Sequence, residues 1–337
     1  MRFITEPEVM RLIAEPGAHA EAVLVIESVL RAQAAGRTVQ AKRVTITHPD
    51  HPGHLQHNVR MLAAMVPAVC AAAVRVYSGF GGTNRSEVIC LFDTTDMRMV
   101  AVISDCALHP VRTAAPFAVA AKHLARTDAR TIGIVGSGRY ARSLLQSVAG
   151  VRTIESVKVY SRDPGNVRRF CDEMRAATGL AIEPAASARA AVRGADIAIL
   201  ATSGNRVVFE ADMLEPGMLV LSLAPGEFDA ATVLAARVFL SAPEQALGDT
   251  PPRQPFAALL AEGRFTRGDV AGDLCEVVAG TSPGRRDDAE AIVYVCPGMG
   301  VLDAGIGRWV YDRALARGLG IELPFGEACH ADGTAAG

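Results

Sequence analysis

The 337-residue sequence lacks the features that mark several classes of protein. It has a single tryptophan and 5% aromatic residues, and its 34 Lys and Arg residues are balanced by 36 Asp and Glu residues. No basic run is present, which argues against nucleic acid as the main partner, because phosphate contacts need clustered Lys and Arg. The longest uncharged apolar stretch, residues 61–74, is broken by Pro67 and is too short to span a bilayer. We therefore expect neither a nucleic acid nor a membrane as partner.

Cysteine usage and the amino terminus indicate a reducing compartment. The seven cysteines are an odd number and form no C-x-x-C pair, so a disulfide framework is not expected. The first residues, MRFITEPEVMRLI, are amphipathic and contain no signal-peptide hydrophobic region. The sequence predicts a cytoplasmic protein.

Four histidines at intervals of three (His48, His51, His54 and His57) are the only motif suggestive of a metal. Prolines and a glycine between them prevent a regular helix, and a metal site needs three or four converging ligands. We expect a polar loop and no metal, and the contact of one of these histidines with substrate stays open.

The length and the hydrophobic half of the composition predict two domains of ordinary size. The first 110 residues contain two apolar-periodic helices, at 7–15 and 18–35, followed by segments with strand character. The predicted strands are 44–47, 74–77, 88–92 and 99–103, and hairpin chemistry at 93–96 favours an antiparallel sheet in an α+β domain.

At residue 113 the pattern changes to strictly alternating strands and helices. A helix at 114–125 precedes strands predicted at 131–135, 157–160, 181–183, 195–202, 218–223, 238–240 and 289–296. Such alternation is typical of βαβ units and a parallel sheet. A last helix is predicted at 303–317. We expect domain boundaries at 1–113, 114–296 and 297–337.

A glycine-rich turn follows the strand at 131–135. Gly136, Gly138 and Ala141 form a G-x-G-x-x-A pattern that a helix continues directly. In this context the first glycine allows a tight turn and the second lets a pyrophosphate approach the helix N-terminus. The motif predicts a dinucleotide-binding site.

The end of the next strand distinguishes NADP from NAD. An NAD site typically has a carboxylate there for the ribose hydroxyls. Here Ser161 and Arg162 end the strand and Asn166 follows, so a guanidinium stands where a 2′-phosphate would be. NADP(H) is favoured, with NAD(H) possible and a solvated basic turn as the alternative.

Several segments together resemble the ornithine cyclodeaminase/mu-crystallin family over nearly the full length. They are VRTAAPFAVAAKHLA, IGIVGSGRYA, APGEFD and GRRDDAEAIVYVCPGMGVLD, and the last third is most similar to the branch of N-(2-amino-2-carboxyethyl)-glutamate dehydrogenases, which form diaminopropionate in siderophore pathways. The resemblance implies an α/β fold in which a Rossmann dinucleotide-binding domain is inserted into an α+β domain for substrate binding and dimerisation, with the final helix returning to the first domain. It also implies a homodimer.

The resemblance assigns roles to residues by their match to the family motifs. Arg112 matches an arginine that holds a substrate carboxylate, and Arg43 matches a second one at a shorter motif. Physically, a guanidinium is suited to bidentate carboxylate binding. The expected cofactor-binding residues are Thr113, Gly136, Ser137, Gly138, Arg139, Tyr140, Ser161, Arg162, Asn166, Thr202, Ser203, Leu223 and Met299.

The sequence departs from the family where proton transfer is concerned. Arg75 stands where the family has a lysine, and an arginine effectively cannot release its proton. A loop with a catalytic aspartate is shortened to Leu223-Ala224-Pro225-Gly226, and Cys296 replaces an Asp or Asn, although catalysis by this thiol is not expected. Asp303 is left as the carboxylate expected near the site as a proton carrier, with Arg75 as a second catalytic candidate.

The favoured function is an NAD(P)H-dependent oxidoreductase that reduces an imine or oxidises a secondary amine in a small, carboxylate-bearing, amino-acid-derived substrate. Arg43, Arg75 and Arg112 would form a cationic pocket for the carboxylates. A cyclodeaminase-type ammonia lyase with catalytic NAD is the first alternative, disfavoured by the missing loop aspartate. A non-catalytic protein that binds a small ligand with NADPH, as mu-crystallin-like members do, is the second.

Overall fold

The computed structural model describes residues 1–47, 58–78, 86–203, 206–248 and 253–325, and the chain divides into two compact units. Unit 1 comprises Met1–Glu15, Arg37–His109 and Gly300–Gly337, and unit 2 comprises Pro16–Gly36 and Pro110–Met299. One unit is therefore inserted into the other along the sequence.

Unit 1 is built on a sheet of eight strands in the order β16-β1-β7-β6-β5-β4-β2, with β3 also paired to β4. All its pairs are antiparallel except β1 with β7, in agreement with the α+β expectation. The strands are β1 (Arg2–Ile4), β2 (Val39–Gln40), β3 (Val44–Thr47), β4 (Asn58–Val66), β5 (Ala71–Ser78), β6 (Glu87–Asp93), β7 (Met99–Ser104) and β16 (Ile321–Glu322).

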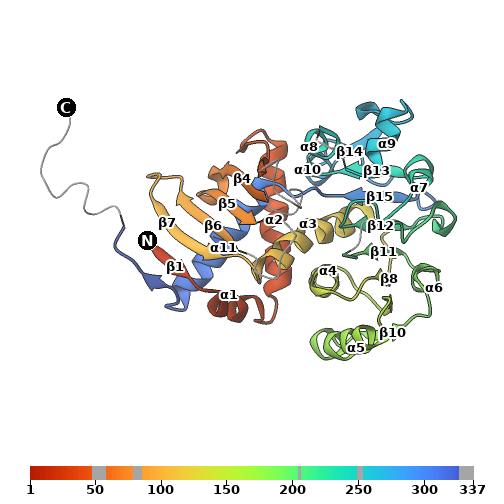
Figure 1. The fold of residues 1–337 in the computed structure, drawn as a ribbon, viewed down its shortest axis with the longest axis horizontal. Coiled ribbons are helices and arrows are strands. Elements are labelled where there is room, and N and C mark those ends of the chain that lie inside the picture. The colour runs from red at the N-terminus through yellow and green to blue at the C-terminus, as the bar shows by residue number, and fades with distance from the viewer. Residues whose placement is uncertain (48–57, 79–85, 204–205, 249–252, 326–337) are drawn as a thin grey trace, which may run out of the picture. The chain divides into compact units, whose positions relative to one another are not determined.

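The core of unit 1 lies between this sheet and helix α11 (Gly300–Ala316), which crosses β4, β5 and β6 (Figure 1). A side chain at Gly300 could not be accommodated, because its Cβ would lie 2.8 Å from the Ala63 carbonyl oxygen. The helix thus approaches the backbone of β4 directly. The shorter helix α1 (Glu6–Ile13) contacts α11 and β7.

Unit 2 contains a fully parallel sheet of eight strands in the order β10-β9-β8-β11-β12-β15-β13-β14. The order reverses at β8, as in a Rossmann fold. Its strands are β8 (Thr131–Val135), β9 (Ser156–Tyr160), β10 (Ala181–Pro184), β11 (Ile197–Leu200), β12 (Leu219–Ser222), β13 (Arg237–Leu240), β14 (Val270–Asp273) and β15 (Ile292–Val295).

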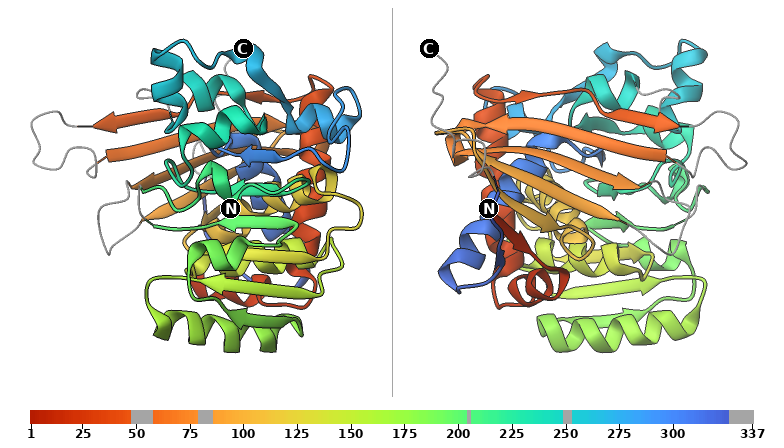
Figure 2. Two further views of the ribbon diagram at one scale, coloured as in Figure 1. Left: turned by 90° about the vertical axis from the view of Figure 1, so that its right-hand side faces the viewer. Right: turned by 60° about the vertical axis from the view of Figure 1, so that its left-hand side comes forward.

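Most helices of unit 2 lie between its strands in the sequence, whereas the first two precede β8, and Figure 2 shows the parallel strands with helices on both sides. They are α2 (Ala18–Ala34), α3 (Leu108–Leu124), α4 (Arg139–Ala149), α5 (Pro164–Thr178), α6 (Ala188–Val192), α7 (Ala230–Ala235), α8 (Pro243–Gly248), α9 (Phe256–Ala261) and α10 (Leu274–Ala279). No helix of the described residues is both long and apolar enough to cross a membrane.

The two compact units differ from the expected domain boundaries in two places. Helix α2 groups with unit 2, because it packs against α10 and α4. Helix α3 begins at Leu108, so it runs without interruption through the boundary expected at residue 113. The apolar stretch at 61–74 forms parts of β4 and β5 joined by the turn at Pro67–Val69, and β4 as such was not expected.

Candidate functional site

The glycine-rich turn of unit 2 lies where the strand order reverses, between the carboxyl ends of β8 and β11. Gly136 has φ of 118°, and a Cβ there would lie 2.2 Å from the Ala201 carbonyl oxygen at the end of β11. Only glycine fits both constraints. Open parallel sheets bind their ligands in the crevice at such a switch point.

The second glycine leaves the start of α4 open. A Cβ at Gly138 would meet nothing within 4 Å, and Gly138 is the residue that precedes the first turn of α4. Ser137 is held in place, because its Oγ lies 2.7 Å from Ser161 Oγ and its carbonyl oxygen accepts a hydrogen bond from Arg142. This fixed, accessible helix N-terminus fits the pyrophosphate of a dinucleotide. Arg139 and Tyr140 lie in the first turn of the helix, 3.1 Å apart between Nη2 and Oη.

The turn after β9 presents Arg162 to solvent. Asp163, which follows it, caps α5 by accepting hydrogen bonds from the backbone of Gly165 and Asn166, at 2.7 and 3.2 Å. The Asn166 side chain also donates to Asp163, at 3.1 Å. The carboxylate in this turn therefore has a structural role, and the guanidinium of Arg162 is the charged group that faces outward.

A buried carboxylate, Glu227, organises the loops after β11 and β12, and the sequence did not single it out. Its Oε1 accepts hydrogen bonds from the backbone N–H and the hydroxyl of Thr202, at 2.7 and 2.8 Å. Its Oε2 accepts from the Ser222 hydroxyl and the Ala224 N–H, at 2.9 and 2.8 Å. Burial raises the pKa of Glu227, although these hydrogen bonds act in the opposite direction. A carboxylate five positions beyond the buried strand β12 was the available signal.

Four other predicted residues of unit 2 have defined surroundings. Arg112 is buried in the first turns of α3, and the hydroxyl of Thr113 is buried with no hydrogen-bond partner among the described residues. Such an unsatisfied hydroxyl suits contact with a ligand. Met299 and Cys296 are also buried, and burial raises the pKa of the Cys296 thiol, which favours its inert neutral form.

Unit 1 holds a buried cluster of charged residues around Arg75. The guanidinium donates from Nε to Asp105 Oδ2, at 2.5 Å, and from Nη2 to Glu87 Oε2, at 2.8 Å. Asp303 Oδ1 on α11 lies 3.8 Å from Arg75 Nε, so the two catalytic candidates from the sequence are neighbours. His109 Nδ1 lies 2.8 Å from Glu87 Oε2.

The charge of Arg75 is thus balanced by carboxylates of its own unit. Burial alone would lower the pKa of its guanidinium, but Asp105, Asp303 and Glu87 together raise it above the usual value. The Arg75 guanidinium also lies over the Tyr77 ring, 4.1 Å from its centroid. Arg75 remains a cation at any accessible pH and is held by these neighbours.

The remaining predicted site residues lie in both units. Arg43 is half-buried in unit 1, whereas Arg112 belongs to unit 2. Thr202, Ser203 and Leu223 follow the ends of β11 and β12. The histidine motif of His48, His51, His54 and His57 lies outside the described residues.

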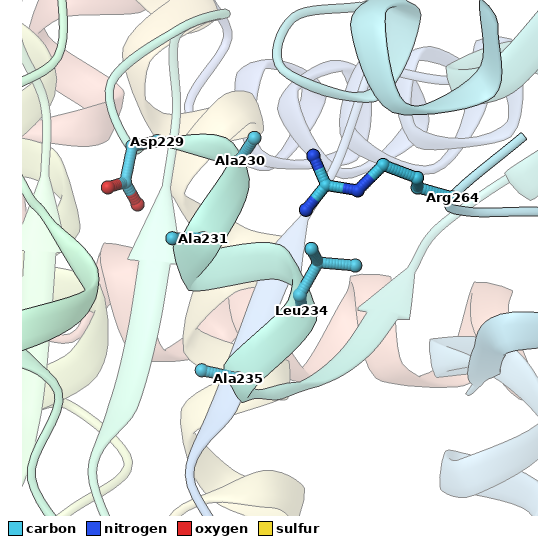
Figure 3. Close-up of a pocket in the computed structure, with 6 residues that line it drawn as sticks. All are labelled: Asp229, Ala230, Ala231, Leu234, Ala235 and Arg264. Carbon is cyan, nitrogen blue, oxygen red and sulfur yellow. The ribbon is translucent and has the colours of Figure 1, made fainter. Parts of the chain in front are cut away.

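A cavity of about 540 Å³ elsewhere in unit 2 contains none of the predicted site residues. Figure 3 shows its lining, which α7 and the single cation Arg264 supply. Its carboxylate, Asp229, caps α7 by accepting from the Thr232 backbone at 2.8 Å, so it serves the helix. The residues that line this open cavity therefore provide no preorganised polar binding site.

Comparison with known proteins identifies relatives along the whole chain. Residues 9–318 match the model of the ornithine cyclodeaminase/mu-crystallin family. A Δ1-pyrroline-2-carboxylate reductase from Bacillus cereus is 30% identical, over 73% of this chain and 76% of that protein. An N-((2S)-2-amino-2-carboxyethyl)-L-glutamate dehydrogenase from Staphylococcus aureus is 27% identical, over 71% of each chain. The comparisons therefore do not single out the dehydrogenase branch.

A solved structure shares the fold almost completely. The Δ1-pyrroline-2-carboxylate reductase of Thermococcus litoralis, determined with NADH and L-proline, superimposes with a TM-score of 0.86 at 26% identity. The match covers 96% of this chain and all of that one. The expected fold class, a Rossmann domain inserted into an α+β domain, is confirmed.

Proposed function

The chain belongs to the ornithine cyclodeaminase/mu-crystallin family, and on that premise we propose that it is an NAD(P)H-dependent oxidoreductase acting on the C–N bond of a small carboxylate-bearing substrate. The observation that carries the proposal is the glycine turn at Gly136, packed against Ala201 at the switch point of the parallel sheet. The reaction is the reduction of an imine or its reverse, the oxidation of an amine.

The nicotinamide cofactor, when bound, supplies or accepts the hydride, and unit 2 provides the residues that would hold it. The open N-terminus of α4 after Gly138 would take the pyrophosphate. The loop of Thr202 and Ser203, fixed by Glu227, and the unsatisfied hydroxyl of Thr113 would contact the rest of the cofactor. Arg139, Tyr140, Asn166, Leu223 and Met299 complete the proposed set.

NADP(H) is the proposed preference. Arg162 is exposed beside the β9 end, and the carboxylate next to it, on Asp163, is engaged in capping α5. A guanidinium without a competing carboxylate favours the 2′-phosphate of NADP(H). NAD(H) remains usable, because the pyrophosphate site does not depend on Arg162.

Arg112 and Arg43 are the proposed ligands of the substrate carboxylate. Arg112 is held in a rigid, buried helical position, which suits the planar geometry of a bidentate contact. We further propose Arg75 and Asp303 as the catalytic residues. Both side chains are buried and belong to the charged cluster of unit 1. The proposed substrate class is a small carboxylate of amino-acid origin, such as arises in siderophore or other specialised-metabolite biosynthesis.

The proposed assembly is a homodimer formed through unit 1. The face of β4 that carries Val59 and Met61 is directed away from the α11 side, and it continues onto β3 through Ile46 and Val44. Val44, Ile46 and Val59 are 47, 58 and 43% exposed, which leaves an apolar stripe for a second copy of the sheet to cover. The proposed location is the cytoplasm, consistent with the free cysteines among the described residues.

An absorbance assay tests the function. The protein is mixed with NADPH or NADH and a panel of Δ1-pyrroline-2-carboxylate and 2-keto acids paired with amines, while the absorbance of the reduced nicotinamide is followed and products are identified. Net loss of absorbance supports the oxidoreductase. A product without net loss would show a lyase, and ligand binding with neither change would show a non-catalytic binding protein.

A pair of glycine variants links the activity to the proposed site. Gly136→Ala places a Cβ 2.2 Å from the Ala201 carbonyl oxygen in a backbone conformation that alanine rarely adopts, so cofactor binding should be lost. Gly248→Ala, at the end of α8 with nothing within 4 Å, is the control and should bind as the wild type does. Equal cofactor affinity in both variants would contradict the placement of the site.

A further inference from the structure

Arg142 on α4 contacts both the glycine-rich turn and the neighbouring helix α5 (Figure 1). Its Nη1 donates to the Ser137 carbonyl oxygen at 2.5 Å. Its Nε and Nη2 lie 2.7 and 2.6 Å from Glu173 Oε2 on α5. The guanidinium also lies over the Phe170 ring of α5, with Cζ 5.3 Å from the ring centroid. With 25% of the side chain exposed, its planar group is therefore fixed on two edges and one face.

The same residue holds two consecutive carbonyl groups at the start of α4. The Arg142 side chain binds the Ser137 carbonyl oxygen, and its backbone N–H donates to the Gly138 carbonyl oxygen at 3.3 Å. In a trans peptide the C=O and the N–H point in opposite directions. Because the Ser137 carbonyl is turned toward Arg142, the Gly138 N–H is directed to the opposite side, where no described residue accepts a hydrogen bond from it. A phosphate oxygen binds to such an N–H group at a helix N-terminus.

The hydrogen bonds that join the turn to β9 do not fix this peptide. The Gly136 N–H donates to the Tyr160 carbonyl oxygen at 2.8 Å. The hydroxyl of Ser137 lies 2.7 Å from Ser161 Oγ. Neither contact involves the peptide between Ser137 and the second glycine, and a glycine restricts the rotation of its peptide less than any other residue. The contact with Arg142 therefore sets the direction of this peptide.

The charge of Arg142 is unusual for its position in α4. A cation near the N-terminus of a helix is unfavourable, because the helix dipole is positive there. The first turn of α4 contains no acidic residue that could balance it, and the balancing carboxylate comes from Glu173 on α5. The ion pair with Glu173 thus stabilises an arginine next to the turn and leaves its Nη1 directed at the Ser137 carbonyl oxygen.

Resting on the proposed function, we propose that Arg142 is a positioning residue of the nucleotide site. It keeps the peptide between Ser137 and Gly138 turned so that its N–H meets the pyrophosphate of the cofactor, and Glu173 keeps Arg142 in place. The ligand group concerned is a diphosphate, which NADH, NADPH and ADP share. The 2′-phosphate of NADPH is proposed to bind at Arg162, so its contribution to binding should not depend on Arg142.

Calorimetry on the full-length protein tests the assignment with two probes, ADP, which has a diphosphate, and adenosine 2′-monophosphate, which has none. Arg142→Met removes the guanidinium and should weaken ADP binding about ten-fold. Binding of adenosine 2′-monophosphate should stay within about two-fold, and the ratio of the NADPH and NADH affinities should not change. Arg142→Lys can reach one of the two partners but not both, so its ADP affinity should lie between those of the wild type and Arg142→Met.

Arg175→Met is the matched control. Arg175 on α5 also donates to a carbonyl oxygen, that of Ile182 at 3.0 Å, and pairs with a carboxylate, Asp172 at 3.2 Å. This variant should bind both probes as the wild type does. An Arg142→Met protein that binds ADP as tightly as the control would overturn the proposal. Equal losses of affinity for the two probes would also overturn it, since they would indicate a general disturbance of unit 2.

Glu173→Gln separates positioning from direct contact with the phosphates. The amide keeps an oxygen for Arg142 but removes the negative charge, so ADP binding should weaken about three-fold in the wild-type background and not at all in the Arg142→Met background. Tighter ADP binding in Glu173→Gln would show that Arg142 itself contacts the phosphates, because the guanidinium would lose its balancing charge. That result would overturn the positioning role.

The failure of the inference and the failure of the proposed function give different results. A wild type that binds ADP, shows the expected losses in the variants and reduces no imine supports the role of Arg142 and refutes the proposed function. A wild type that reduces imines, while Arg142→Met binds ADP unchanged, refutes the role of Arg142 alone. Binding of neither ADP nor NADPH to the wild type would refute both.

Discussion

Ser137 Oγ and Ser161 Oγ are 2.7 Å apart, so the glycine-rich turn after β8 is hydrogen-bonded to the end of β9. The first turn is proposed to bind the pyrophosphate and the second to bind the adenosine ribose. Because one hydrogen bond connects them, the position of Arg162 relative to the pyrophosphate is set by the fold of unit 2. This geometry makes the nucleotide preference testable at a single residue.

Arg162→Ala should weaken NADPH binding about ten-fold or more, corresponding to ~1.5 kcal/mol for a lost charged hydrogen bond. NADH affinity should be nearly unchanged, because NADH has no 2′-phosphate. Fluorescence titration of both nucleotides measures the two affinities. Arg193→Ala, another exposed arginine of unit 2, serves as control. Equal responses to both nucleotides would mean that Arg162 is only a surface residue.

Glu227→Gln should weaken binding of both nucleotides without preference between them. The carboxylate accepts from two backbone N–H groups, on Thr202 and Ala224, and an amide in its place turns an NH₂ donor toward one of these donors. An unsatisfied buried donor costs about 1–3 kcal/mol, and the loop is expected to shift. Nucleotide affinity and the urea midpoint should be measured together. A lower midpoint with unchanged affinity would leave Glu227 a purely structural residue.

The sequence predicts those features of the molecule that local patterns determine. The strand at 131–135 and its glycine turn agree with β8 and Gly136, because a tight turn and a close backbone approach both demand glycine locally. The cluster of unit 1 could not be predicted in this way. Glu87 and Asp105 reach Arg75 across 12 and 30 residues of sequence, through the antiparallel register of β5, β6 and β7.

The placement of helix α2 shows the same limit. Its apolar periodicity predicts a helix, and the structure places α2 at Ala18–Ala34. Periodicity identifies the buried face but not the partner, and here the partner is α10, more than 200 residues later in the sequence. The order of elements in the sequence therefore does not reveal the packing partner of a helix that contacts a distant part of the chain.

Replacing Ile46 by Glu should convert the proposed dimer into a monomer. Ile46 is 58% exposed and pairs with Val59 on the neighbouring strand. The introduced charge would therefore disturb packing against the sheet of the second copy but not the fold of unit 1 itself. Multi-angle light scattering at micromolar concentration measures the mass. Leu24→Glu, an exposed apolar residue on α2 at 57%, should leave the dimer intact. A wild-type monomer at that concentration would contradict the assembly.

His19 should make the protein less stable in mild acid. Burial lowers the pKa of His19 from 6.5 to about 4, so the folded state keeps it neutral while the unfolded state takes up a proton. The contribution of neutral His19 to the free energy of unfolding is therefore complete above pH 6.5, and it falls as the pH drops toward 4. The loss between pH 7 and pH 4.5 is about 2 kcal/mol.

Urea unfolding of the wild type and of His19→Asn at these two pH values measures this contribution. The variant should lose about 2 kcal/mol less between them. The pKa of Glu27 lies at about 2 despite its burial, because Lys122, His123 and Arg31 stabilise the carboxylate. Glu27 therefore changes the free energy of unfolding only below its ordinary pKa of 4.5. It therefore does not interfere in this pH range. Parallel curves for both proteins would contradict the assignment.

Arg112→Lys tests the substrate class. The lysine keeps the positive charge but lacks the planar fork, so a bidentate contact with a carboxylate should be lost even in this mild change. Binding of the substrate found in the absorbance assay should weaken by ~1.5 kcal/mol or more, which is about ten-fold, while NADPH affinity changes little.

Isothermal calorimetry resolves this difference, because it measures substrate and cofactor binding on the same protein. Arg126→Lys is the matched control: Arg126 is a part-buried arginine of unit 2 that pairs with Asp196 at 2.5 Å and is assigned no role in binding. Its substrate affinity should equal that of the wild type. If Arg112→Lys binds the substrate as tightly as this control does, Arg112 holds no carboxylate, and the substrate would have to be recognised without a bidentate contact to its acid group.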